Sequence, residues 1–353
     1  MNLDNPTSFL VLDPQKMLSF IDGLPRQLQT AWELGMNSTL PPWTGIRQVL
    51  VAGMGGSAIG ADLLAAYITP NCLTPFFIHR DYDLPAWAGG PETLVIASSH
   101  SGNTEETLSA FETALARNCR CLAITTGGTL AQEAQQAKIP LWKFEHRGQP
   151  RSAVGYSFGL LLAALLQMNM IPDPSKEISR AIHAMQEQQK NIQADVPVTQ
   201  NPAKQIALKL IGHWVSVFGA GILAPVSRRW KGQISEIAKA WAQFEFLPEA
   251  NHNTLAGIIN PKNLHPDFIA IFLRCSSDHP RNQLRGDLTR KVFTSEGLNS
   301  EVIDAQGEIP LAQLWTCLHL GDYVSYYLAM TYGVDPTPVS AIEGFKREMV
   351  AGG

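Results

Sequence analysis

The sequence predicts an α/β protein built from two doubly wound domains, each with a parallel β-sheet. Three observations support this prediction. Short apolar runs alternate with segments of helical length, glycine- or serine-rich loops follow the first of these runs, and a similar plan occurs twice along 353 residues. Strands buried on both faces read as continuous apolar runs, and their alternation with helices is typical of parallel sheets.

The first half contains four such runs, and we expect strands at 47–52, 75–78, 93–97 and 121–125. A helical pattern follows the first run, with Ile59, Leu63, Leu64 and Tyr67 on one face. The longest apolar stretch, Ser157–Ile171, has 15 residues and contains two amides. Because spanning a bilayer takes about 20 apolar residues, this stretch is expected to be a buried helix.

The second half repeats the plan. A polar helical stretch at 175–193 gives way to Asp195–Pro202, which contains two prolines and no helical periodicity, so we expect a linker there. Beyond it, apolar runs predict three further strands, at 213–221, 268–274 and 301–305. We therefore expect an N-terminal domain at residues 1–192 and a C-terminal domain at residues 203–353.

Composition excludes several classes of function. A net charge of −4 with no run of like charges does not suit a nucleic-acid partner, which requires a clustered basic surface. The first residues show neither a basic n-region nor an apolar h-region, so we expect no signal peptide and a cytoplasmic protein without membrane contact. Five scattered cysteines without a C-x-x-C pair indicate buried thiols, and the histidines show no zinc-binding spacing. We expect neither a metal nor another cofactor.

The first glycine-rich loop, Gly53–Gly60 (GMGGSAIG), is the first candidate binding site. Gly55 and Gly56 allow close approach of the backbone to a ligand. Ser57 adds a hydroxyl where free N–H groups open the next helix, and this combination suits a phosphate.

The same loop also fits the dinucleotide fingerprint, as Gly53-x-Gly55-x-x-Ala58. Asp81 or Asp83 could then be the acid that binds the ribose. The spacing from Gly53 to Asp81 is 28, longer than the roughly 20 residues that the fingerprint expects. A nicotinamide-dependent dehydrogenase therefore remains an alternative on this loop alone.

The second loop, Ser99–Thr107 (SHSGNTEET), favours a phosphate over a dinucleotide. Ser99, Ser101 and Thr104 bring three hydroxyls to the carboxyl end of a buried strand, which a dinucleotide fold does not need. Asn103 has N-cap and capping-box spacing to Glu106. No Walker A motif occurs, so the chemistry of nucleoside-triphosphate P-loops is excluded.

The corresponding loops of the second half are degenerate. Gly219-Ala-Gly221-Ile-Leu stands where the first half has Gly53-Met-Gly55-Gly56-Ser57. Cys275-Ser-Ser-Asp-His replaces the serine-rich loop, so we expect one anion site per chain rather than two.

Together the two loops resemble the sugar isomerase (SIS) domain, which binds phosphosugars. The chain as a whole resembles the bifunctional phosphoglucose/phosphomannose isomerases, which carry two SIS-type, flavodoxin-like domains. Further segments that carry the resemblance are His79–Trp87, Pro150–Tyr156, Phe246–Asn253 and Asp335–Lys346. Two positions depart from the family pattern: His100, where an aromatic residue is common, and Ser235, where asparagine is usual.

The resemblance implies a substrate site and a catalytic set. It implies substrate binding by Gly55, Gly56, Ser57, Ser99, Ser101, Thr104 and Arg151. It also implies that Glu236 is the base, that His252 opens the sugar ring, and that Lys346 reaches the ring oxygen. Because the family's histidine comes from the neighbouring subunit, a homodimer with shared sites is implied.

The assignment of the base has two alternatives. The segment Trp230–Lys239 reads as the start of a helix with Glu236 in its first turns, where a solvated glutamate is common. Glu249, beside His252, is a competing carboxylate that we rank second.

The implied reaction interconverts glucose 6-phosphate, and mannose 6-phosphate, with fructose 6-phosphate through a metal-free cis-enediol. Such a proton transfer requires a carboxylate base. The alternative is a non-catalytic sugar-phosphate sensor with the same fold. Glu236, His252 and Lys346 distinguish the two functions, because a sensor needs none of them.

Overall fold

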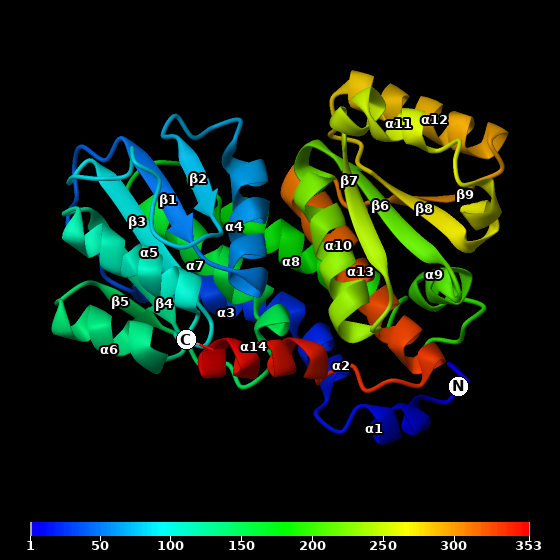
Figure 1. Ribbon diagram of the computed structural model, residues 1–353, viewed down its shortest axis with the longest axis horizontal. Coiled ribbons are helices and arrows are strands. Elements are labelled where there is room, and N and C mark those ends of the chain that lie inside the picture. The colour runs from blue at the N-terminus through cyan, green and yellow to red at the C-terminus, as the bar shows by residue number, and fades with distance from the viewer. Residues whose placement is uncertain (1, 353) are drawn as a thin grey trace.

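The computed structural model describes residues 2–352 and consists of two parallel β-sheets with a layer of helices between them (Figure 1). The end residues of the two predicted domains, 1 and 353, lie outside the described part. The arrangement confirms the predicted fold class of two parallel-sheet α/β units.

The first sheet has the strand order β2-β1-β3-β4-β5, and every neighbouring pair is parallel. Its strands are β1 (Gln48–Ala52), β2 (Phe76–His79), β3 (Thr93–Ser99), β4 (Arg120–Thr125) and β5 (Leu141–Lys143). The second sheet has the order β7-β6-β8-β9, again entirely parallel. Its strands are β6 (Trp214–Ala220), β7 (Ala242–Leu247), β8 (Phe268–Arg274) and β9 (Asn299–Asp304).

Helices cover both faces of each sheet. The outer face of the first sheet carries α5 (Glu105–Ala116) and α6 (Gly128–Gln136), and that of the second carries α11 (Thr254–Gly257) and α12 (Pro280–Ser295). The layer between the sheets contains α3 (Leu24–Asn37), α4 (Gly55–Ile68), α7 (Val154–Gln167), α8 (Ser175–Gln189), α9 (Pro202–Leu210), α10 (Ala224–Ile237) and α13 (Pro310–Tyr332). The short helices α1 (Phe9–Leu12) and α2 (Met17–Asp22) precede it.

A single apolar core runs through this central layer and joins the two halves. Helix α13 is buried along almost its whole length and packs against α8, α9 and α10. A buried ion pair holds α13 to α10: Arg229 Nε and Nη2 lie 3.2 and 2.8 Å from the two carboxylate oxygens of Asp322. Within residues 2–352, no helix has the length and apolar content needed to cross a membrane.

The predicted linker, Asp195–Pro202, is fixed by hydrogen bonds to the start of α9. The side chain of Asn201 caps α9 by accepting a hydrogen bond from Lys204 N at 3.0 Å. The ammonium of Lys204 in turn donates to the carbonyls of Ala194 and Val196. The division into residues 1–192 and 203–353 stays a prediction, because the core is continuous across it.

Two strands of the structure, β5 and β7, were not predicted from the sequence. Strand β5 has only three residues and follows Pro140, so it leaves almost no apolar run. Strand β7 (AQFEFL) alternates apolar and polar residues because it is an edge strand and half-buried. The buried helix expected at 157–171 is α7, shifted toward the N-terminus, and the polar helix expected at 175–193 is α8.

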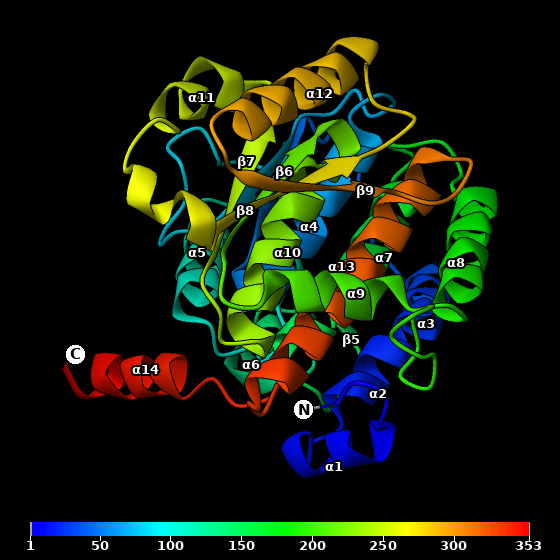
Figure 2. The same cartoon turned by 90° about the vertical axis from the view of Figure 1, so that its right-hand side faces the viewer.

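The C-terminal helix α14 (Ser340–Gly352) extends away from the body of the molecule (Figure 2). Its apolar residues Ile342, Phe345 and Met349 are 43%, 65% and 46% exposed. Lys346 lies on this helix.

Candidate active site

The two predicted phosphate loops meet at the carboxyl edge of the first sheet. Strands β1 and β3 pair side by side, with Ala52 opposite Ala97. The chain continues from β1 to β2 on one side and from β3 to β4 on the other, so the sheet order reverses between them. Ligands of open α/β sheets bind at such reversal points, outside the carboxyl ends of the strands.

Hydroxyls line the β3–α5 loop and fix its shape. Ser99 Oγ lies 3.0 Å from Thr104 Oγ1 and accepts a hydrogen bond from Gly102 N at 3.1 Å. Ser101 Oγ accepts from Asn103 N at 3.2 Å. In the neighbouring loop, Ser57 stands in the first turn of α4 and is buried. Hydroxyls and free helix N–H groups of this kind can bind an oxyanion.

The predicted N-cap role of Asn103 is wrong. Thr104 occupies the N-cap position of α5, and no side chain caps this helix. Asn103 Oδ1 instead accepts hydrogen bonds from the N–H and hydroxyl of Thr129 on α6, at 2.9 and 3.1 Å. Its amide therefore ties the loop to the next helix, which local spacing cannot reveal.

Arg151 lies directly behind the glycine loop, in the short helical turn η2 (Pro150–Ser152). A Cβ atom on Gly56 would stand 2.5 Å from the carbonyl oxygen of Pro150 and 3.3 Å from Arg151 N. Only glycine allows the first turn of α4 and the Arg151 backbone to approach this closely. The loop and the arginine therefore form one site.

The guanidinium of Arg151 joins three distant segments. It is 3% exposed. Nη2 donates to the carbonyls of Pro336, at 3.0 Å, and of Thr337, and Nη1 lies 3.5 Å from Glu236 Oε2. Burial lowers the pKa of Arg151, and the Glu236 carboxylate opposes this effect. Two candidates from opposite halves of the sequence are thus in contact.

The predicted place of Glu236 in its helix is wrong. Helix α10 begins at Ala224, with Pro225 in its first turn, and ends at Ile237. Glu236 therefore lies in the last turn rather than in the first turns. The helix dipole at this end is negative and disfavours a carboxylate. The Glu236 side chain is 34% exposed, so its outer part remains accessible.

Two residues near the site were not among the candidates for it. Lys239 donates from Nζ to Glu236 O at 2.7 Å. His146 hydrogen-bonds His100 of the second loop, with 2.9 Å between Nδ1 and Nε2. Burial and His100 lower the pKa of His146 to about 4. A basic residue just beyond the end of a helix is a pattern that indicates an interaction with the last carbonyls of that helix, and Lys239 has this position. No local pattern of the sequence indicates the contact of His146 with His100.

The remaining catalytic candidates lie apart from this cluster. His252 ends the short helix η4 (Glu249–His252) and is exposed. Helix α11, which follows it, lies at the top of Figure 1, whereas α14, beyond Thr337, lies at the bottom. Glu249 Oε1 accepts a hydrogen bond from Asn253 at 3.0 Å. The Lys346 side chain is exposed and makes no hydrogen bond or ion pair with the side chains and backbone that the structure describes.

The equivalent loops of the second sheet are filled by the protein's own side chains. Gly221 has φ of 49°, the same value as Gly55. A Cβ atom on Gly221 would stand 2.5 Å from Asp278 Oδ1. Gln313 Oε1 accepts hydrogen bonds from Cys275 Sγ and Ser277 Oγ at 2.6 and 2.8 Å. A carboxylate in this place would repel a phosphate, which supports the prediction of one anion site.

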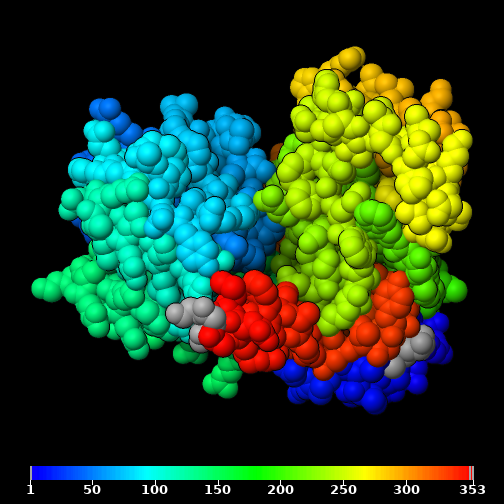
Figure 3. Space-filling model, viewed as in Figure 1, coloured from blue at the N-terminus to red at the C-terminus, as the bar shows by residue number. Residues whose placement is uncertain are grey.

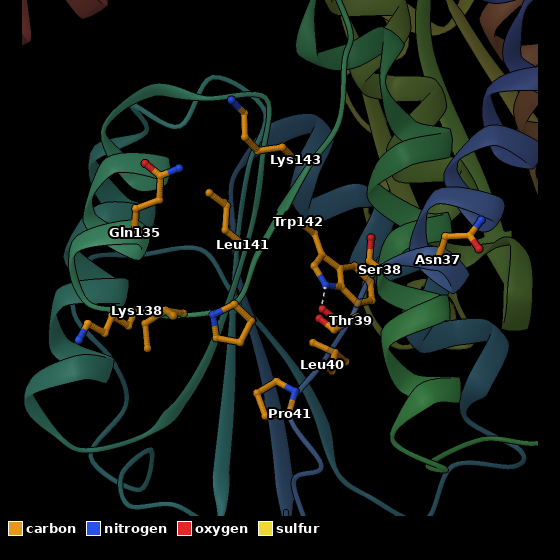
Figure 4. A pocket seen from close by; sticks show the side chains of 12 residues that line it. Asn37, Ser38, Thr39, Leu40, Pro41, Gln135, Lys138, Leu141, Trp142 and Lys143 are labelled. Carbon is orange, nitrogen blue, oxygen red and sulfur yellow. Dashed lines mark hydrogen bonds between the residues drawn. The ribbon is translucent and has the colours of Figure 1, made fainter.

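The surface is hollowed between the two halves, and the C-terminal segment lies across the lower end of this furrow (Figure 3). A separate hollow of about 820 Å³ lies beside β5, between residues 37–41 and 135–143 (Figure 4). There Trp142 donates to the carbonyl of Thr39 at 3.1 Å. It contains none of the candidate residues.

The chain is similar to several known proteins. Residues 199–349 match a family model described as the bacterial phospho-glucose isomerase C-terminal SIS domain. The bifunctional phosphoglucose/phosphomannose isomerase of Caldicellulosiruptor bescii is 38% identical over 94% of this chain and 98% of its own. The protein of the same name from Aquifex aeolicus is 32% identical over 95% and 98%.

A solved structure has a similar fold over most of the chain. The tagatose-6-phosphate ketose/aldose isomerase of Escherichia coli superimposes with a TM-score of 0.72 at 16% identity, covering 92% of this chain and 95% of that chain. The identity to the two relatives, over almost the whole length of both sequences, confirms the resemblance that the loops indicated. The chain therefore belongs to the bifunctional phosphoglucose/phosphomannose isomerase family of enzymes.

Proposed function

We propose that this chain interconverts glucose 6-phosphate, and mannose 6-phosphate, with fructose 6-phosphate. The relatives that carry this activity in their name align with nearly all of the chain. The observation that carries the proposal is the contact between Arg151 and Glu236, 3.5 Å apart beside the glycine loop. A carboxylate next to an anion-binding loop is what proton transfer on a sugar phosphate requires.

In this proposal the first half of the chain binds the substrate. The phosphate is held by the hydroxyls of Ser57, Ser99, Ser101 and Thr104 and by the N–H groups of Gly55 and Gly56. Arg151 remains tied to Glu236 and to the segment before α14, so it aligns the base with the phosphate loop.

Glu236 then moves one proton between two carbons without a metal. Its carboxylate removes the proton from C2 of the open-chain aldose, and the electron pair of that C–H bond forms the C1=C2 double bond of a cis-enediol while O1 gains a proton. Glu236 next returns its proton to C1 as O2 loses one and becomes the carbonyl of the ketose. No electron leaves the sugar, so the step needs no redox cofactor.

The ring must open first, and we assign this step to His252 of a second copy, with Lys346 near the ring oxygen. The assignment is supported by the position of α11, which directly follows His252 and lies at the other end of the molecule from α14 in Figure 1. A homodimer would bring the histidine of one copy to the cradle of the other.

The deciding experiment offers fructose 6-phosphate to the purified protein and identifies the products by NMR. We expect both glucose 6-phosphate and mannose 6-phosphate. The variant Glu236→Gln should lose about 10²–10⁴-fold in kcat, while its Kd for fructose 6-phosphate stays close to the native value. The matched control Glu249→Gln should keep most activity. Binding without any aldose product would favour the sensor, and loss of activity only in E249Q would move the base to Glu249.

A chelator tests the metal-free mechanism. We expect full activity after prolonged dialysis against a strong chelator. Inactivation that added zinc reverses would contradict the mechanism.

Mixing two inactive variants tests the shared site. Glu236→Gln and His252→Gln homodimers are each expected to be inactive. After the subunits are exchanged, a mixed dimer contains one site with both native residues, so about a quarter of native activity should return. No recovery, with exchange verified by mass spectrometry, would place His252 in the site of its own chain.

A further inference from the structure

The backbone at Lys239 is unusual for a residue with a long side chain. Lys239 follows the C-cap of α10, Ala238, and has φ of 55°, in the left-handed region. That region is favoured by glycine and asparagine, and other residues occupy it where the surroundings hold them there. The left-handed turn folds the Lys239 side chain back toward the end of α10.

The ammonium of Lys239 is bonded to the residue that carries the candidate base. Nζ donates to the carbonyl oxygen of Glu236 at 2.7 Å. This carbonyl is one of the last four of α10, which have no partner within the helix. The unpaired carbonyls make the helix end negative, and a cation placed there offsets that charge.

Three charged groups act on this ammonium, each from a different segment. Burial is the main effect that lowers the pKa of Lys239, to about 8, and the positive charge of Arg151 in η2 acts in the same direction. Asp335, before α14, and Glu236 itself act in the opposite direction. Lys239 therefore belongs to the same charge cluster as the Arg151–Glu236 pair.

On the basis of the proposed function, we propose that Lys239 is a positioning residue for the proton transfer. Its ammonium offsets the negative end of α10 and holds the last turn, so that the Glu236 carboxylate stays directed at Arg151. Without it, a carboxylate at the helix end would face uncompensated carbonyl dipoles. Lys239 acts through Glu236 and needs no contact with the sugar.

Two variants of Lys239 and one control test this role, through kcat and KM for fructose 6-phosphate as a function of pH. In the native enzyme, kcat should fall as the pH rises through about 8, where Lys239 loses its charge. Lys239→Arg keeps the charge, so this fall should move up by at least about one pH unit. Lys239→Met should lower kcat about tenfold or more at neutral pH, with a smaller change in KM. The control Lys231→Met, on the same helix, should match the native enzyme.

A native pH profile and kcat in K239M would overturn the proposal, and so would identical profiles for K239R and K239M. If K239M does not fold, as judged by circular dichroism, the profile of K239R decides: a fall at the native pH overturns the proposal. A native enzyme that forms no aldose phosphate would overturn the proposed function, and this proposal with it. An active native enzyme with an unaffected K239M overturns the role of Lys239 alone.

Discussion

Replacing Gly56 by alanine tests how strongly the phosphate loop and Arg151 depend on each other. The added Cβ would stand 2.5 Å from Pro150 O and 2.9 Å from Pro150 C, whereas ordinary contact begins near 3.4 Å. The first turn of α4 and the η2 turn would therefore have to separate by about 0.9 Å, the difference between 3.4 and 2.5. This displacement would act on the backbone of Arg151 directly.

The expected cost follows from that distance. Overpacking of this kind costs about 1–3 kcal/mol, and the gain of alanine over glycine in a helix returns about 0.5–1 kcal/mol. We expect the free energy of unfolding to fall by about 1–2 kcal/mol. A misplacement near 1 Å in a catalytic site costs on the order of 10²-fold in rate, so kcat/KM should fall by about 10–100-fold.

Urea unfolding, followed by tryptophan fluorescence, and steady-state kinetics with fructose 6-phosphate measure the two effects. The matched control is Gly232→Ala in α10, where a Cβ would meet nothing within 4 Å. It should raise the free energy of unfolding by about 0.5–1 kcal/mol and leave kcat/KM unchanged. A G56A variant with native kcat/KM and native stability would refute the coupling between loop and arginine.

Three further predictions concern buried charge, and urea unfolding measures each of them. Burial raises the pKa of Asp278 to about 6, so the folded protein favours the protonated carboxyl, and the stability that this form contributes is lost as the pH rises through that value. The variant D278N should therefore be more stable than the native protein at neutral pH and equally stable below pH 3.8. The pKa of His146 is lowered to about 4, so native stability should fall as the pH drops from 6.5 toward 4, and H146F should flatten this fall. D322N leaves Arg229 buried without its partner and should cost about 3–5 kcal/mol, of which the double variant R229M/D322L should recover most; a small cost in D322N would contradict this.

Much of the fold could be predicted from the sequence because parallel strands buried on both faces leave continuous apolar runs. The runs at 93–97 and 268–274 correspond to β3 and β8 nearly residue for residue. Strand β7, half-buried at a sheet edge, has no such run, because burial on both faces is what produces it. Helix α10 begins earlier than the polar pattern at 230–239 indicates, because Pro225 in its first turn is the start signal.

One part of the candidate site could likewise be predicted from the sequence, and another part could not. The hydroxyls of Ser99, Ser101 and Thr104 could be predicted, since a loop at a strand end carries its own local pattern. The partners of Arg151 could not, because Glu236 lies 85 residues away and the carbonyl of Thr337 lies 186 residues away. Such contacts depend on how the two sheets pack through the central helices, which no short window of sequence reports.

The packing of the two halves also bears on why the site would need a second copy. Glu236 comes from the last turn of α10, so it lies at the end of that helix opposite to its start beside the carboxyl end of β6. His252 follows β7, parallel to β6, and so lies at the carboxyl edge of the second sheet. One chain therefore presents the proposed base and the proposed ring-opening histidine at opposite ends of α10, which spans about 20 Å at 1.5 Å per residue. A side chain cannot bridge that length, so if both residues act on one sugar, two copies must supply them.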